Sequence, residues 1–260
     1  RLNAHQIRLS EDMFVADLFA DTTHHGATIL CATYPRAYLD LNRAANELEA
    51  ELFEDPCADM IDPKSHRAAA GLGTVPRLVA ENMPIYKDKL KFAEAQARLD
   101  KIYHPFHAAL AGQLAAMQKP SGFAVLLDAH SMPSQAVRQH VSKARNPQID
   151  FVLGNRRGQS CAPALSAWVQ NYLRDKGYCV EMNHPYAGGY ITEHYGRPAS
   201  GFHALQIEIN RSIYMDEAEY RKNSDFSLLQ ENMTALVKNL VSALPQLASN
   251  LTDTTELAAE

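Results

Sequence analysis

An aspartate and a histidine that follow an apolar run form the pattern best suited to chemistry. Asp128 and His130 are two residues apart after the apolar residues 123–127, so both side chains lie on one face of a strand as it leaves a sheet. A histidine in that place can present a ring nitrogen to a metal ion, and a neighbouring carboxylate can orient the ring or join the metal ligands. The alternative is a solvated histidine in the turn that ends the strand.

A glutamate within a β-rich run is the second candidate. Residues 205–210 alternate apolar and polar side chains, so the apolar ones are expected to face one side of a strand and Glu208 the other. A carboxylate on such a strand must find a partner or shift its pKa, which suits a general base acting on metal-bound water. The alternative is a salt bridge to an arginine on the sheet surface.

Two cationic segments could recognise a carboxylate. Arg43 carries a planar guanidinium that can pair with a carboxylate through two parallel hydrogen bonds, and Asn42 can add an amide donor. Arg156 lies in the compact loop of residues 154–158, between glycines, and could clamp a dicarboxylate. Solvated arginines at a strand end and in a turn are the alternatives.

A tyrosine and a further aspartate complete the candidates. Tyr190 follows Gly188 and Gly189, which permit close approach of the backbone to a ligand, so its hydroxyl could reach a reacting oxygen. The alternative is a flexible connection between strands. Asp12 lies in the first turn of a predicted helix, where capping and the helix dipole explain a carboxylate, unless a metal lies nearby.

Strands and helices that alternate along the chain must position these residues. This alternation predicts an α/β fold with a mostly parallel sheet, whose sites lie at the carboxyl ends of strands. The strands are expected at residues 27–32, 38–42, 123–127, 151–153, 178–182 and 205–210. The helices are expected at residues 11–19, at 87–117 with a bend or break at Pro105, from a cap at Ser160 to Gly177, and at 224–244.

The bulk composition excludes several classes of protein. The 260 residues carry a net charge of −5, which does not indicate a nucleic-acid partner, and no apolar run is long enough to cross a membrane. Four cysteines without a CxxC pair favour a reduced, cytoplasmic protein. No Gly-x-Ser-x-Gly elbow, phosphate-binding loop or HExxH helix occurs. Monomer and homo-oligomer both stay open.

Six motifs occur in order along the chain. They are Tyr34-Pro35-Arg36 with Asp40-Leu41-Asn42-Arg43, Asp128-Ala129-His130-Ser131, Leu153-Gly154-Asn155 with Ser160-Cys161, Gly188-Gly189-Tyr190-Ile191-Thr192, His194-Tyr195-Gly196-Arg197-Pro198, and His203-Ala204-Leu205-Gln206-Ile207-Glu208. In this order and spacing, from about Glu11 to Leu240, the sequence resembles the N-formylglutamate amidohydrolase family.

The resemblance implies a fold and a domain organisation. The family is similar to the zinc carboxypeptidase-like proteins, which include aspartoacylase, so a three-layer, mostly parallel mixed sheet flanked by helices is expected. Residues 1–260 are expected to form a single domain, with a frayed tail from about residue 248.

The resemblance also implies a metal site. His130 would be a Zn²⁺ ligand, Asp12 would belong to the metal shell, and Glu208 would be the general base and proton shuttle. The family usually begins with a Ser-Pro-His segment whose histidine also binds zinc, and this sequence lacks it. We therefore expect either that the first strand is missing or that the chain is a homologue without a metal.

The activity implied by the resemblance is hydrolysis of N-formyl-L-glutamate to formate and L-glutamate, a step of histidine degradation. Asn42 and Arg43 would hold the substrate or polarise its carbonyl, and Arg156 and Tyr190 would assist. The small-molecule substrate is thus an N-acyl amino acid. The alternatives are a metal-free protein that binds an acidic amino acid, and a zinc peptidase or a deacylase for another acyl group.

Overall fold

The computed structural model describes residues 2–138 and 148–252. The chain divides into two compact units. Unit 1 comprises residues 1–11 and 31–112, and unit 2 comprises residues 12–30 and 113–260. The single domain expected for residues 1–260 stays a prediction, and residues 253–260 of the expected frayed tail lie outside the described residues.

The centre of unit 2 is a four-stranded mixed sheet in the order β3-β6-β4-β5. The strands are β3 (Ala124–Met132), β4 (Phe151–Gly154), β5 (Val180–Met182) and β6 (Phe202–Asn210). β3 pairs with β6 and β4 with β5 in parallel, whereas β4 and β6 are antiparallel. The prediction of a mixed sheet is thereby confirmed, with two parallel pairs joined by one antiparallel pairing.

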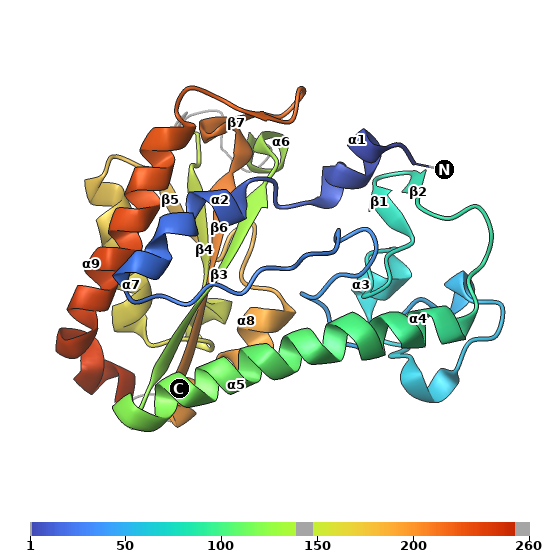
Figure 1. Cartoon of the computed structure of the whole chain (residues 1–260), viewed down its shortest axis with the longest axis horizontal. Coiled ribbons are helices and arrows are strands. Elements are labelled where there is room, and N and C mark those ends of the chain that lie inside the picture. The colour runs from blue at the N-terminus through green and yellow to red at the C-terminus, as the bar shows by residue number, and fades with distance from the viewer. Residues whose placement is uncertain (1, 139–147, 253–260) are drawn as a thin grey trace. The chain divides into compact units, whose positions relative to one another are not determined.

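Helices flank this sheet. Figure 1 shows α7 (Pro163–Asp175) and α9 (Phe226–Thr252), which pack against each other, along one face. The apolar side chains of β6, Leu205, Ile207 and Ile209, are fully buried in the same core cluster as residues of these helices. The alternation seen in the sequence therefore separates an apolar face from a polar one.

The remaining elements of unit 2 are short. Its helices are α2 (Val15–Leu18), α6 (Ser134–Arg138) and α8 (Tyr190–Tyr195), with 3₁₀ turns at Ala20–His25, Arg156–Gly158, Pro198–Ser200 and Arg211–Ile213. A two-stranded ribbon joins β7 (Met215–Asp216) and β8 (Arg221–Lys222).

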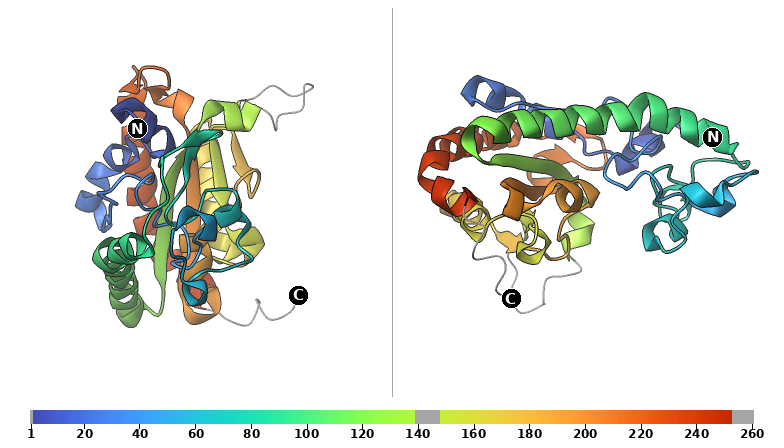
Figure 2. Two further views of the ribbon diagram at one scale, coloured as in Figure 1. Left: turned by 90° about the vertical axis from the view of Figure 1, so that its right-hand side faces the viewer. Right: turned by 90° about the horizontal axis from the view of Figure 1, so that it is seen from below.

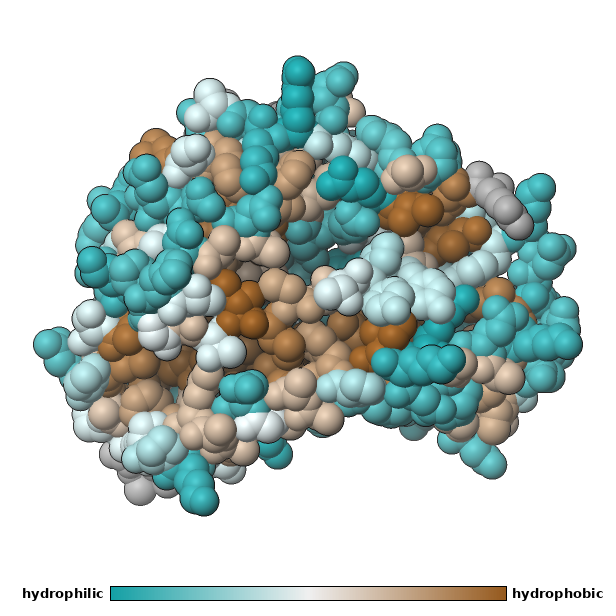
Figure 3. Space-filling view, in the orientation of Figure 1, coloured by the Kyte–Doolittle hydropathy of each residue, from teal (hydrophilic) through white to brown (hydrophobic). Residues whose placement is uncertain are grey.

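The last helix, α9, is amphipathic. Its buried positions Leu229, Met233, Leu236 and Leu240 recur at helical spacing and face the core. In the space-filling view, hydrophilic side chains predominate over its upper part (Figure 3). Within the described residues, no helix has both the length and the apolar character that crossing a bilayer requires.

Unit 1 is built from short elements and loops. Its helices are α1 (Ala4–Ile7), α3 (His66–Ala69) and α4 (Phe92–Arg98), and 3₁₀ turns occur at Arg8–Ser10, Ala50–Leu52 and Ala58–Met60. β1 (Leu78–Ala80) and β2 (Met83–Pro84) pair antiparallel.

The strand predicted at residues 38–42 is wrong. The buried carboxylate of Asp40 accepts a hydrogen bond from the backbone N–H of Asn42, and the N–H of Asp40 donates to the carbonyl of Thr74. An aspartate that bonds the backbone two residues ahead closes a turn and competes with strand pairing.

The strand predicted at residues 27–32 is also wrong. This segment is irregular, and its apolar character reflects packing of Ala27 and Ile29 against the core of unit 2. A short apolar run fits either a buried strand or a buried loop, and periodicity does not separate the two.

The helix predicted at residues 87–117 begins instead at Phe92. A π-helical turn, Leu99–Tyr103, links α4 to α5 (His104–Ser121), and Figure 2 shows the three segments as one continuous helical rod. Pro105 therefore does not break the helix, because the π-turn just before it changes the hydrogen-bond register.

Two helix boundaries in unit 2 also differ from prediction. The N-cap of α7 is Ala162 rather than Ser160, and Pro163 occupies the first turn, where its missing N–H costs nothing. The hydroxyl of Ser160 donates instead to the carbonyl of Ala204. α9 extends beyond the expected end at residue 244 to Thr252.

Candidate active site

The pairing of β3 with β6 places the two main candidates side by side. His130 and Glu208 are partners in the parallel register, as are Asp128 and Gln206. Partners on neighbouring strands point to the same face of a sheet. All four side chains are buried and lie on the face opposite the core formed with α7 and α9. Asp128 and His130 lie within β3 and not beyond its end, because the strand continues to Met132.

His130 lies between two carboxylates. Its Nδ1 is 3.0 Å from Oδ2 of Asp12, and its Nε2 is 2.9 Å from Oδ1 of Asp128. Burial by itself lowers the pKa of His130, but the charges of Asp128 and Asp12 and their hydrogen bonds outweigh it and hold the pKa well above its usual value. Without a metal, both ring nitrogens carry protons and donate to these carboxylates.

Asp12 is bound to β3 and does not cap a helix. Its Oδ1 accepts hydrogen bonds from the backbone N–H of Ser131 at 2.7 Å and from the Ser131 hydroxyl at 3.3 Å. The N-cap of α2 is Phe14, without a side-chain cap. The capping explanation for Asp12 is therefore wrong, and this carboxylate is fixed beside His130.

A second layer of hydrogen bonds surrounds this pair. Thr192, in α8, donates its hydroxyl to Oδ2 of Asp128 at 3.1 Å. Gln206 donates its amide to Oε1 of Glu208 at 2.7 Å. Arg211, itself buried, donates from Nε to the Ser131 hydroxyl at 3.1 Å. These contacts hold the acidic groups in a continuous polar network.

The pKa of Tyr186 is affected by two charged side chains of the site, Glu208 and Arg211. Burial raises the pKa of the Tyr186 hydroxyl, the negative charge of Glu208 raises it further, and the positive charge of Arg211 lowers it. Glu208 thus shares its surroundings with a phenol and a guanidinium.

Arg156 and Tyr190 lie in the loop and helix next to this network. Arg156 forms an ion pair of 2.8 Å with the exposed Glu193, and its backbone is left-handed, with φ of 53°. Tyr190 stacks on His194, with ring centroids 5.0 Å apart. Their roles in substrate binding stay predictions.

Asn42 and Arg43 belong to unit 1, whereas the cluster around His130 belongs to unit 2. Arg43 donates to the carbonyls of Leu72 and Asn42 and forms an ion pair of 3.6 Å with Asp40. Burial lowers the pKa of Arg43, and the charge of Asp40 opposes that effect. Its guanidinium organises this turn, and its role in substrate binding stays a prediction.

The side chains around His130 supply some, but not all, of the ligands that a zinc site in unit 2 would need. Among the described residues, no group of three or more His, Cys, Asp or Glu side chains is arranged to hold a metal. Asp12 and His130 nevertheless direct an oxygen and a nitrogen at each other, and both atom types are common zinc ligands. Asp128 would orient the imidazole from its other nitrogen, as partners of metal-bound histidines do.

Sequence reasoning missed four supporting residues. Ser131, Thr192 and Arg211 received no role, although each bonds a member of the network. Gln206 precedes Glu208 by two residues in the alternating run 205–210, and that offset is the signal by which it could have been found.

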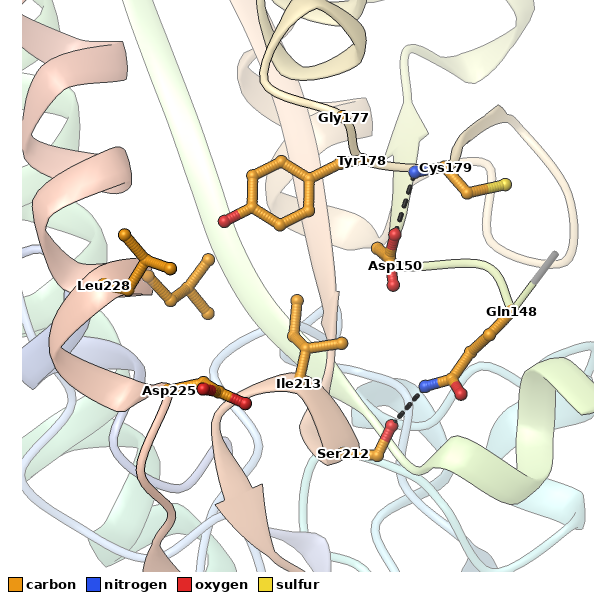
Figure 4. A pocket seen from close by; sticks show the side chains of 10 residues that line it. Gln148, Asp150, Gly177, Tyr178, Cys179, Ser212, Ile213, Asp225 and Leu228 are labelled. Atoms are coloured by element: carbon orange, nitrogen blue, oxygen red, sulfur yellow. Dashed lines mark hydrogen bonds between the residues drawn. The ribbon is translucent and has the colours of Figure 1, made fainter.

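A separate pocket of about 560 Å³ opens elsewhere on unit 2. Figure 4 shows Tyr178 between Asp150 and the start of α9, where Asp225 and Leu228 lie. The described residues that line it include none of the predicted site residues. The candidate chemistry therefore rests on the β3–β6 face and not on this pocket.

The sequence matches one family of known proteins over most of its length. The family model described as N-formylglutamate amidohydrolase matches residues 1–215. An N-formylglutamate deformylase from Pseudomonas putida is 32% identical over 240 residues, covering 90% of this chain and 80% of the relative. The Pseudomonas aeruginosa enzyme of the same name is 32% identical over 237 residues, with the same coverage.

Two solved structures are similar to the chain. A crystal structure of N-formylglutamate amidohydrolase from Ralstonia eutropha JMP134 superposes with a TM-score of 0.88 at 35% identity, covering 94% of this chain and 87% of that one. The gene product Atu2144 of Agrobacterium tumefaciens gives a TM-score of 0.55 at 19% identity, covering 91% of this chain and 79% of that one, and shares the fold.

Proposed function

Because the chain belongs to the N-formylglutamate amidohydrolase family and is a hydrolase of an amide bond, we propose that it converts N-formyl-L-glutamate and water into formate and L-glutamate. The observation that carries this proposal is the alignment of His130 with Glu208 on one sheet face, inside a chain that matches the named relatives over most of its length. A mixed sheet with candidate metal ligands also supports the zinc carboxypeptidase-like fold.

We further propose that the enzyme depends on zinc, held by Asp12 and His130. Zn²⁺ bound there would polarise the amide carbonyl and lower the pKa of water. With Zn²⁺ bound, the Nε2–H of His130 would still donate to Asp128, and the Nδ1 proton would be lost so that its lone pair could serve the metal. Ser131 holds Asp12 through its backbone N–H and its hydroxyl.

Glu208 is the proton carrier in this mechanism. It accepts a proton as the water oxygen attacks the formyl carbon, and it delivers that proton to the nitrogen as the C–N bond breaks. Formate and the free amine of glutamate are the products. The buried position of Glu208 and its bond from Gln206 suit a base whose side chain stays in place during the transfer.

A cytoplasmic location belongs to the same proposal. The four cysteines are unpaired thiols in the structure, which fits a reducing compartment.

The assay that tests the function measures hydrolysis of N-formyl, N-acetyl and N-succinyl amino acids, with and without added Zn²⁺. We expect N-formyl-L-glutamate to be the preferred substrate and a chelator to remove activity together with the metal. Glu208→Gln should retain zinc but lose about 10²–10⁴-fold in kcat, because the base is removed while the geometry stays. His130→Ala should lose both the metal and the activity.

Two results would contradict the proposal. Parental turnover by Glu208→Gln would remove the role of that carboxylate. Stoichiometric binding of an acidic amino acid, with no turnover of any N-acyl substrate by the zinc-loaded parent, would identify a binding protein instead.

A further inference from the structure

Gln206 occupies a buried position directly beside the proposed base. It precedes Glu208 by two residues on β6, so both side chains leave the same face of the sheet. Its side chain is almost fully enclosed, at 4% exposure. A buried amide needs partners for both its oxygen and its nitrogen.

The orientation of the Gln206 amide follows from the chemistry of its partners. Its Oε1 lies 2.6 Å from the backbone nitrogen of Gly189, which can only donate, so the oxygen must face that N–H. Its Nε2 then faces Glu208 and donates to Oε1 of that carboxylate at 2.7 Å. The hydroxyl of Thr192 lies 3.4 Å from the same Gln206 oxygen. The amide therefore cannot flip without losing a partner at each end.

The loop that carries Gly189 packs against the neighbouring strand β4. Gly154 of β4 pairs with Gln206 across the sheet. A Cβ at Gly154 would lie 2.7 Å from the carbonyl carbon of Ala187 and 2.7 Å from the backbone nitrogen of Gly188. The backbone of residues 187–188 can approach residue 154 this closely because that residue has no side chain, and the next residue of the loop, Gly189, donates to Gln206.

We propose that Gln206 is a positioning residue for the reaction. It joins the backbone of the loop before α8 to one oxygen of Glu208, and so fixes the rotamer of the carboxylate while Oε2 serves the proton transfer. This role rests on the proposed function of Glu208. It assigns to Gln206 an effect on turnover that acts through Glu208 and not through substrate binding.

The competing explanation is that Gln206 only anchors the loop. Two variants separate the explanations. Gln206→Glu keeps an oxygen that accepts from Gly189 but replaces the amide donor with a carboxyl group that would share a proton with Glu208. Gln206→Met is similar in size and loses both bonds. Circular dichroism and the thermal midpoint check that each variant folds.

The experiment is a double-mutant cycle with Glu208→Gln, measured on the zinc-loaded enzyme with N-formyl-L-glutamate. We expect each Gln206 variant to lower kcat about 10–100-fold, as for loss of a hydrogen bond to a charged group, with KM changed less than about threefold. In the Glu208→Gln background, the same substitutions should change the residual kcat less than about twofold. The carboxylate that Gln206 orients is replaced there by an amide that cannot act as a base.

Each other outcome overturns a defined claim. If Gln206→Glu retains parental kcat, or if the Gln206 variants cost the same factor in both backgrounds, Gln206 is a loop anchor and the inference is wrong. If Glu208→Gln alone retains parental kcat, the proposed function fails first, which distinguishes the two failures.

Discussion

At the scale of single residues, the site is organised around the imidazole of His130. Asp12 and Asp128 hold its two nitrogens at 3.0 and 2.9 Å. In the metal-free state a proton on Nδ1 occupies the direction in which a cation would bind. Binding of the proposed Zn²⁺ would require loss of that proton, so we propose that the carboxylate of Asp128 at the far nitrogen controls how well the ring would serve as a ligand.

Replacing Asp128 with asparagine tests this control. The substitution Asp128→Asn keeps the size and an acceptor oxygen but removes the charge that orients His130, so we expect zinc affinity to fall about 10–100-fold. Competition titration with a chelating dye measures it. The matched control is Asp175→Asn, because that carboxylate is exposed at the end of α7, and it should leave the affinity unchanged. Equal zinc affinity in Asp128→Asn and the parent would contradict the orienting role.

At the scale of elements, β4 determines where the loop before α8 can lie. Gly154 is the last residue of the strand, and the backbone of residues 187–188 packs on it. The same loop carries the N–H that binds Gln206. A change at this strand end is therefore transmitted to the side chains on β6.

Gly154→Ala should displace this loop. Its Cβ would meet backbone atoms that have no rotamer to change, so we expect a loss of about 1–3 kcal/mol in the free energy of unfolding and a lower kcat. Thermal unfolding and steady-state kinetics measure the two effects. Gly112→Ala is the control, because Gly112 lies exposed inside α5 with open space around its Cβ position, where alanine stabilises a helix by about 0.5–1 kcal/mol. A Gly154→Ala protein as stable and active as the parent would show that the loop does not depend on this contact.

Across the whole molecule, the cysteines differ in how far they are exposed. Cys161 is fully enclosed in the main core of unit 2, together with residues of β6, α7 and α9. Burial raises the pKa of the Cys161 thiol to about 12. Cys31, in unit 1, is exposed. Partial burial of its thiol group raises the pKa of that thiol as well.

Alkylation should therefore report on the opening of unit 2. At pH 8 iodoacetamide should modify Cys31 in the native protein and reach Cys161 only after unfolding, since the thiolate is the nucleophile and Cys161 is both neutral and enclosed. Peptide mass spectrometry measures the two rates. Equal rates in the native protein would contradict the burial of Cys161.

The raised pKa of Cys161 also makes stability depend on pH. Because the thiol has a higher pKa in the folded state than in the unfolded state, its contribution to the free energy of unfolding is complete below the ordinary pKa of 9.0 and decreases as the pH rises above that value.

The amino-acid pattern was enough to predict which side chains share a face of β6 and which residues were candidates for chemistry. Alternation of apolar and polar residues is a local property of a strand, so it separated Leu205 and Ile207 from Gln206 and Glu208 without any tertiary information. The same local reasoning misplaced residues 27–32 and 38–42, because packing and a side-chain turn replaced strand pairing there.

The contacts between these candidates depend on the folded chain. Asp12 contacts His130 across 118 positions of sequence, and Thr192 reaches Asp128 across 64. Contacts of this kind depend on the register between β3 and β6 and on the path of the loop before α8, which no local pattern encodes. Propensity and spacing act within a few residues, whereas register results from packing the whole unit, so the partners of each acidic group emerged only from the fold.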